Sequence, residues 1–287
     1  MRYEAPQSIE AAIDLLATVD GAYVLAGGTD LLVKLRAEML EPDLVVDIKR
    51  IAGMKDITPE DGGWRIGAAV SGAEMGEHAA LAADWPGVVE AVGLIGSTQV
   101  QGRATLAGNL CNASPAADSV PAMVAANASV RIVGPNGTRD VPVVEVPAGP
   151  GKTTLAPGEF IASVFLPAKG AGASDAYLRF IPRTEMDIAV VGCGVSLALD
   201  GAGKVTSARV ALGAVGPKVM LVDPAAEAIL GRTLDDSALD DLAEACSAAA
   251  SPIDDKRGTV DFRRHVAGVL ARRVALIAAT RAKGEPA

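Results

Sequence analysis

The sequence predicts an α+β fold, and three patterns along the chain carry that prediction. A strand–helix–strand pattern over residues 22–48 indicates a small βαβ unit with parallel strands. Two strands joined by a turn at Asn136-Gly137 indicate an antiparallel hairpin in a second, mixed lobe. Beyond residue 175, three strands followed by three helices indicate a separate α+β domain. We therefore expect three units, made of residues 1–57, 58–174 and 175–287.

The first unit opens with a helix for which Ser8 is the expected N-cap. A strand over residues 22–28, a helix over 29–39 and a strand over 43–48 follow. The turn after the first of these strands carries Gly27 and Gly28, at the edge where α/β sheets bind ligands. A strand, a glycine turn and a helix start form an arrangement that holds phosphates on backbone amides.

The later elements follow from the same alternation of apolar and polar residues. In the second lobe we expect strands over residues 64–70, 129–145 (a hairpin) and 158–168, with one or two helices in 71–95 interrupted at Pro86. In the third unit we expect strands over 175–183, 187–199 and 205–215, then helices over 223–231, 237–250 and 261–280. The last helix has an apolar stripe of Phe262, Val266, Val269, Leu270 and Val274, and we expect its basic residues to face solvent or another subunit.

Composition and charge exclude several classes of protein. Half of the 287 residues are hydrophobic, yet no apolar run approaches the ~20 residues that span a bilayer. The first ten residues contain acids where a secretory signal needs an apolar core, so we expect a soluble, cytoplasmic protein. Twenty-six basic against 35 acidic residues, with no dense basic run, argue against nucleic-acid binding.

The few cysteines and histidines argue against a metal centre on this chain. Cys111, Cys193 and Cys246 are far apart and form no CxxC pair, so neither a zinc site nor a cysteine-held iron–sulfur cluster fits. His78 and His265 cannot build a metal site between them, and we expect structural or surface roles for both. Any redox chemistry must therefore be carried by a bound organic cofactor.

Two glycine-rich segments resemble nucleotide-binding motifs but lack required residues. The segment Gly149–Thr154, GPGKTT, has Val146 where a phosphate loop needs its first glycine, and no helix follows it. The segment Gly192–Gly194 has Leu197 where a dinucleotide fingerprint needs its third glycine. We interpret this second segment as a site of close packing within a strand.

Two other segments indicate a ligand site. The first is AGGTD, residues 26–30, which by itself is as often a simple turn as a phosphate site. The second runs from Ser97 to Met123, which we expect to be a long non-helical stretch whose small residues let backbone amides approach a ligand. Thr105, Asn109 and Asn112 add hydrogen-bonding groups. Asp118 either caps the next helix or accepts a hydrogen bond from the ligand.

Together these segments resemble the FAD-binding subunits of the molybdenum hydroxylases, among them xanthine dehydrogenases and carbon monoxide dehydrogenase medium subunits. The resemblance rests on VLAGGTDLLVKL and QGRATLAGNLCNASPAADSVPAMVA, and on AYLRFIPRTEMDIAVVGCGVSL, ARVALGAVGP and DFRRHVAGVLARR in the third unit. It covers nearly the whole chain. It implies a two-lobed FAD-binding domain of the vanillyl-alcohol-oxidase/PCMH type, then a domain with a three-stranded antiparallel sheet and a helical bundle.

The resemblance also implies which residues contact FAD. The first loop, around the pyrophosphate, falls on Val24, Leu25, Ala26, Gly27, Gly28, Thr29, Asp30 and Leu31. The second segment contributes Ala104, Thr105, Ala107, Gly108, Asn109, Asn112 and Asp118. Ile95 and Ile161 take the apolar positions beside the flavin, and Arg179 takes the place of a basic residue, often Lys, at its pyrimidine edge. Cys111 is expected to be a small buried neighbour of the flavin rather than a redox thiol.

The function implied is an FAD-dependent electron-transfer subunit in a heterotrimer. A large subunit would hold the molybdenum cofactor and a small subunit the [2Fe–2S] clusters, and an external acceptor would take the electrons from FAD. Two alternatives stay open: a stand-alone FAD-dependent oxidoreductase with its own substrate pocket, and a binding or scaffold protein that has lost the cofactor. The substrate, the acceptor and the number of heterotrimers per particle do not follow from the sequence.

Overall fold

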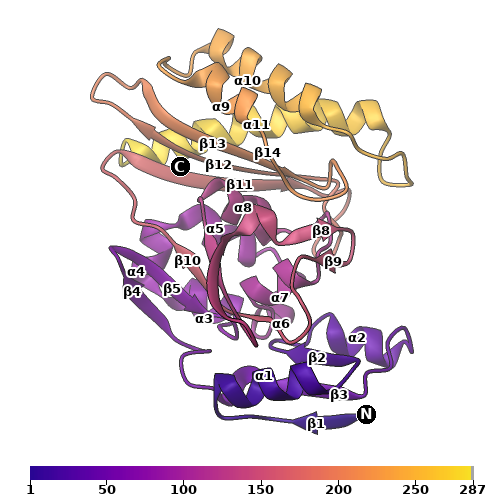
Figure 1. Cartoon of the computed structure of the whole chain (residues 1–287). Coiled ribbons are helices and arrows are strands. Elements are labelled where there is room, and N and C mark those ends of the chain that lie inside the picture. Colours follow the sequence, from indigo (N-terminus) through magenta and orange to yellow (C-terminus); the bar gives the residue numbers. More distant parts are fainter. Residues whose placement is uncertain (286–287) are drawn as a thin grey trace.

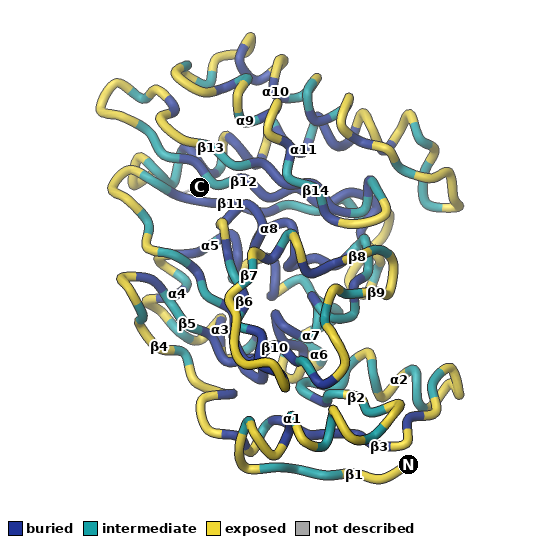
Figure 2. Tube along the Cα trace, in the orientation of Figure 1, coloured by how far each residue is buried: buried dark blue, intermediate teal, exposed yellow. Residues whose placement is uncertain are grey.

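The computed structural model describes residues 1–285 and arranges three larger β-sheets from one end of the molecule to the other, with a fourth sheet of two short strands (Figure 1). The N-terminal lobe lies at one end, a mixed lobe fills the middle, and three helices cover the sheet at the opposite end. Residues 119–126 and 190–195, where the middle and C-terminal parts meet, are buried, whereas most of residues 22–31, which face the middle lobe, are only partly buried (Figure 2). The α+β fold class is confirmed.

The N-terminal lobe contains a parallel sheet, as predicted. Its order is β1-β3-β2, with β1 (Arg2–Glu4) and β2 (Ala22–Leu25) both parallel to β3 (Leu44–Asp47). Ser8 caps α1 (Ile9–Thr18) by accepting a hydrogen bond from the Ala11 amide at 3.2 Å. Helix α2 (Leu31–Arg36) is shorter than the predicted 29–39, and η1 (Ile48–Arg50) follows β3. Strand β1 was not predicted.

The middle lobe is built on a five-stranded antiparallel sheet of order β4-β5-β10-β6-β7. Its strands are β4 (Ile57–Glu60), β5 (Gly63–Gly67), β6 (Ser129–Gly134), β7 (Gly137–Pro142) and β10 (Phe160–Leu166). The last of these in the chain, β10, lies between β5 and β6 at the centre of the sheet, so the sheet is complete only when the chain returns after β7 to insert this strand.

The predicted helical region 71–95 forms three short helices rather than one or two. They are α3 (Gly72–Glu77), α4 (Ala79–Asp84) and α5 (Pro86–Val92). The break at Pro86 was predicted and the break at His78 was not. His78 ends α3 and caps α4, because its ring Nδ1 accepts a hydrogen bond from the Leu81 amide at 3.1 Å. The histidine therefore has the structural role expected for it.

The expectation of a long non-helical stretch over residues 97–123 is wrong. This segment forms α6 (Thr98–Gln101), α7 (Leu106–Cys111) and α8 (Ser119–Ala125). Every residue of α8 is buried, so its small side chains pack well as core. Alanine has the highest helix propensity of any residue, and tertiary burial here supplies the stability that such short helices lack alone.

The third part has an antiparallel sheet of four strands, not three. Strands β11 (Ala173–Phe180), β12 (Val191–Leu199) and β13 (Val205–Gly213) were predicted, and the short β14 (Met220–Leu221) was not. Helices α9 (Asp223–Ile229), α10 (Asp236–Ala249) and α11 (Val260–Ala282) cover one face (Figure 1). Helix α8 packs against the other face. The approach at Gly194 is so close that a Cβ there would lie only 2.7 Å from the Pro121 carbonyl oxygen. The close packing expected at this glycine segment is confirmed.

Helix α11 only partly follows the predicted stripe. Val266, Leu270 and Val274 are buried against the sheet, but Phe262 is 40% exposed. The expectation that the basic residues face solvent is wrong for Arg263, which is 4% exposed. Its guanidinium donates to the Val190 and Ala214 carbonyls and to the Asp255 carboxylate, so its charge and its donors are satisfied within the fold.

None of the helices in residues 1–285 is both long enough and apolar enough to cross a membrane. Over the same residues, no three His, Cys, Asp or Glu side chains come together in a group that could hold a metal ion.

Candidate functional site

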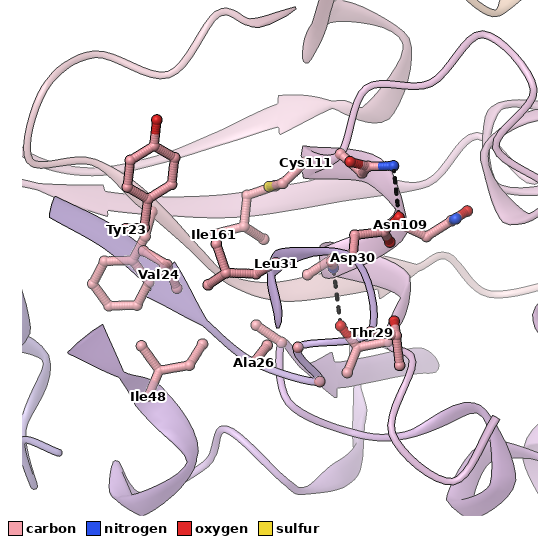
Figure 3. A pocket seen from close by; sticks show the side chains of 18 of the residues that line it. Tyr23, Val24, Ala26, Thr29, Asp30, Leu31, Ile48, Asn109, Cys111 and Ile161 are labelled. Carbon is pink, nitrogen blue, oxygen red and sulfur yellow. Dashed lines mark hydrogen bonds between the residues drawn. The ribbon is translucent and has the colours of Figure 1, made fainter. Parts of the chain in front are cut away.

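A cleft of about 400 Å³ lies between the N-terminal and middle lobes, where the carboxyl end of β2 faces α7 and β10 (Figure 3). Its lining includes the AGGTD loop and residues of the second sequence motif, about eighty positions later in the chain. Val24, Ile48 and Ile161 lie toward one end of the cleft, whereas Thr29, Asp30 and Asn109 lie toward the other. The cleft therefore suits a ligand with one apolar and one polar part.

Most of the residues predicted to contact FAD line this cleft. They are Val24, Ala26, Gly27, Gly28, Thr29, Asp30, Leu31, Ile95, Ala104, Thr105, Ala107, Gly108, Asn109, Asn112 and Ile161. Leu25, Asp118 and Arg179 are not among the lining residues. Leu25 is buried, and Asp118 and Arg179 form an ion pair with each other.

The two motifs touch at Gly27. A Cβ at this position would lie 1.9 Å from the Arg103 carbonyl oxygen and 3.3 Å from Ala104 Cα, so only glycine fits. Gly28 follows with φ +81°, in the left-handed region that glycine adopts at no steric cost. These two glycines hold the loop against the second motif and turn it toward the cleft.

The amides of this loop have no acceptor among residues 1–285. The N–H groups of residues 27–31 make no hydrogen bond to the described protein, and these residues are half-buried or exposed at the edge of the cleft, where a ligand can reach them. Lys49 holds the start of the loop, because its ammonium donates to the Ala26 carbonyl at 2.9 Å and pairs with Asp47 at 2.7 Å. The loop thus presents successive donors from a fixed position, which is the geometry of an anion site.

Polar side chains connect the loop to α7. The Lys34 ammonium donates to Asn112 Oδ1 at 2.7 Å, and Asn112 Nδ2 donates to Asp30 Oδ1 at 3.1 Å. Asp30 and Lys34 lie on one side of α2, and Asn112 ends α7. These bonds join the two walls of the cleft.

Thr105 fixes the start of α7 beside the loop. It is 2% exposed, and its hydroxyl accepts a hydrogen bond from the Gly108 amide at 2.9 Å. We expect Thr105→Val to lower the free energy of unfolding by about 1 kcal/mol, because the valine keeps the shape but removes the cap. Urea denaturation measures this change. Ser97→Ala is the control, because Ser97 stands at the N-cap of α6 but makes no capping hydrogen bond. An equal loss of stability in this control would contradict the capping role of Thr105.

Asp118 does not act as a helix cap. Its carboxylate makes no capping bond to α8, accepts from Arg179 Nη1 at 2.7 Å, and accepts from the Tyr177 hydroxyl at 3.3 Å. Burial raises the pKa of Asp118 to about 6, although Arg179 and Tyr177 both lower it. The neighbouring Ser119 donates to Asn109, which does line the cleft, so the ion pair is one residue removed from the site.

Several lining residues were missed by the sequence analysis. Strands β8 (Pro147–Gly149) and β9 (Lys152–Thr153) form a hairpin after η2 (Val143–Glu145), and the Gly151 amide donates to the Ala113 carbonyl. Gly151 and Thr153 line the cleft, so the GPGKTT segment, dismissed as a phosphate loop, still forms a wall. No local signal identifies it, because only the tertiary fold brings it there. Cys111, expected as a neighbour of the flavin, also lines the cleft; the other lining residues outside the prediction are Ala22, Tyr23, Lys34, Leu40, Ile48, Ala68, Leu155, Glu159 and Phe160.

Cys111 lies on the cleft wall, and its environment argues against thiol chemistry. Burial raises the pKa of this thiol to about 12. Because the thiolate is the reactive form, a thiol with this pKa is almost entirely unreactive near neutral pH. It is a packing neighbour of the site.

Comparison with known proteins identifies both halves of the chain. Residues 1–169 match the family model for the FAD binding domain in molybdopterin dehydrogenase, and residues 176–278 match the CO dehydrogenase flavoprotein C-terminal domain. The carbon monoxide dehydrogenase medium chain of Hydrogenophaga pseudoflava is 31% identical over 272 residues, 94% of each chain. The xanthine dehydrogenase FAD-binding subunit of Escherichia coli O157:H7 is 30% identical over 285 residues, 99% of this chain and 97% of the relative.

Solved structures agree along the whole length. A chain of the CO dehydrogenase from Oligotropha carboxidovorans superposes with a TM-score of 0.93 at 30% identity, covering 98% of both chains. A chain of quinoline 2-oxidoreductase from Pseudomonas putida 86 superposes with a TM-score of 0.90 at 27% identity and the same coverage. The chain therefore belongs to the FAD-binding medium subunits of the molybdopterin dehydrogenases, a family of oxidoreductase subunits.

Proposed function

We propose that this chain is the FAD-carrying electron-transfer subunit of a heterotrimeric molybdenum hydroxylase. It would accept electrons from the [2Fe–2S] clusters of a small subunit and deliver them to an external acceptor. The observation that carries the proposal is the run of amides at residues 27–31, which lack an acceptor in the described structure and border a cleft lined by both motifs.

The residues present fit FAD. A diphosphate is a strong hydrogen-bond acceptor, and successive backbone amides can hold it without a large positive charge, which matters on a chain with 26 basic and 35 acidic residues. Thr105, Asn109 and Asn112 offer hydrogen bonds to the polar parts of the cofactor. Ile95 and Ile161 would exclude water beside the flavin without an aromatic stack.

FAD, when bound, can take up two electrons and release them singly or in pairs. The chain's own task is to bind and orient the cofactor and to keep water from it. None of the cleft side chains has to act as a general acid or base, which agrees with the high pKa of Cys111. Arg179 stays our candidate for the basic residue near the pyrimidine edge of the flavin, although it is paired with Asp118 and lies outside the cleft lining.

The relatives suggest where the other steps take place. The similar chains are medium chains or FAD subunits of carbon monoxide, xanthine and nicotinate dehydrogenases, so we place substrate oxidation on a large molybdenum subunit. A small iron–sulfur subunit would link the two centres. We propose that the complex works in the cytoplasm, and that the units of this chain divide at residues 57 and 174.

The test is purification of the tagged chain from its native source, followed by a visible spectrum and metal analysis. Two co-purifying chains with flavin, iron and molybdenum would support the heterotrimer. A lone yellow protein that turns over a small organic substrate would favour the stand-alone FAD oxidoreductase. A colourless protein that cannot be reconstituted with FAD would overturn both and favour a binding protein without cofactor.

A further inference from the structure

Lys34 is the one basic side chain among the residues 1–285 that line the cleft. The acidic ones are Asp30 and Glu159. Glu159 is neutralised by Arg139, with Nη2 and Oε2 2.9 Å apart, and Asp30 accepts a hydrogen bond from Asn112. A bound diphosphate would bring further negative charge next to Asp30, so a cation beside the loop would add to the binding that the backbone amides provide.

The position of Lys34 suits this role. It lies on the side of α2 that carries Asp30, and its amide donates to the Asp30 carbonyl at 3.0 Å. Its half-buried side chain reaches across to Asn112 at the end of α7, on the opposite wall. The ammonium is therefore held at the cleft, beside the loop whose amides have no acceptor.

The charge of Lys34 is also available. Its hydrogen-bond partner is the neutral Asn112 carbonyl, so no carboxylate within salt-bridge distance cancels the ammonium in the described structure. Lys49 differs, because it contacts the same loop at Ala26 but is paired with Asp47 at 2.7 Å. A lysine bonded to a neutral acceptor can exchange that bond for a phosphate oxygen at little cost and gain a charge-assisted bond.

We infer that Lys34 supplies the counter-charge for the diphosphate of FAD and so selects a phosphorylated flavin over riboflavin. The inference rests on the proposed function, since it concerns the same cleft. Asn112 is then a positioning residue that keeps the ammonium at the cleft before the cofactor binds.

The experiment compares Lys34→Met and Lys34→Arg with Arg36→Met, a matched control on an exposed residue of the same helix. The full chain, freed of flavin, is titrated with FAD and with riboflavin, which shares the ring but has no phosphate. We expect Lys34→Met to weaken FAD binding about 10- to 100-fold and riboflavin binding less than about 2-fold. Lys34→Arg should recover most of the FAD affinity, and Arg36→Met should match the wild type.

The ionic strength gives a second measurement. FAD binding to the wild type should weaken as salt is added, and this dependence should be flatter in Lys34→Met. Equal losses of FAD and riboflavin affinity in Lys34→Met would indicate a structural role and overturn the inference, as would FAD binding unchanged from the wild type. A wild-type chain that binds neither flavin would instead overturn the proposed function.

Discussion

Gly27→Ala should weaken FAD binding about 100-fold. The added methyl group would lie 1.9 Å from the Arg103 carbonyl oxygen and 2.7 Å from its carbonyl carbon, and backbone atoms cannot rotate away as a side chain can. The loop and the second motif must therefore separate, which moves the amides of residues 27–31 away from the opposite wall. Overpacking of this kind costs about 3 kcal/mol, which corresponds to a loss of affinity of about 100-fold.

The flavin-to-protein ratio of the purified variant and its FAD dissociation constant measure this effect. Gly76→Ala is the matched control, because no atom lies within 4 Å of the position of its Cβ and the residue lies within α3. This control should keep its flavin and gain slightly in stability. A Gly27→Ala protein that retains a full complement of flavin would show that FAD binding does not depend on the close contact between the two motifs.

Local patterns in the sequence are sufficient to predict some of the elements and part of the site. The parallel pairing of β2 and β3 follows from the strand–helix–strand spacing. Both glycines of the loop are at positions that favour glycine, Gly27 because of the close approach of Arg103 and Gly28 because of its positive φ. The two motifs converge on one cleft, as the family resemblance implied. That the site residues contact FAD stays a prediction, both for those that line the cleft and for Leu25, Asp118 and Arg179, as do the unit boundaries.

The predictions that the structure contradicts, and the residues that were missed, have physical causes that local sequence does not reveal. The small residues of 97–123 favour an irregular segment by local pattern, but burial of α8 against Gly194 and Gly213 stabilises a helix too short to form alone. The β8–β9 hairpin reaches the cleft only through tertiary contacts such as Gly151 to Ala113. Arg263 is buried because distant carbonyls and Asp255 satisfy it, and no helical periodicity reveals such partners.

The second large effect is expected on stability, for a substitution of Arg179. This residue of β11 forms an ion pair with Asp118, which directly precedes α8. Arg179 and Asp118 have side chains only 6% and 11% exposed. Arg179→Met keeps the length of the side chain but leaves a buried carboxylate with only the Tyr177 hydroxyl as a side-chain partner. We expect the free energy of unfolding to fall by about 3 kcal/mol near neutral pH, because an unpaired buried charge is costly. Urea denaturation measures the loss.

The loss in Arg179→Met should depend on pH. Burial already raises the pKa of Asp118 to about 6 in the wild type, and Arg179 opposes that rise, so removing Arg179 moves this pKa higher still. A carboxyl whose pKa is raised by folding contributes stability that is fully present below its unfolded value and is lost as the pH rises through the folded value. The loss of stability in the variant should therefore be large at about pH 7.5 and smaller at about pH 5, where the carboxyl takes up a proton.

The double variant Asp118→Asn, Arg179→Met should recover stability at the higher pH, because no buried charge remains. An equal loss of stability at both pH values would mean that Arg179 stabilises this junction by packing alone. The charge of the ion pair would then have no role in the stability of the fold.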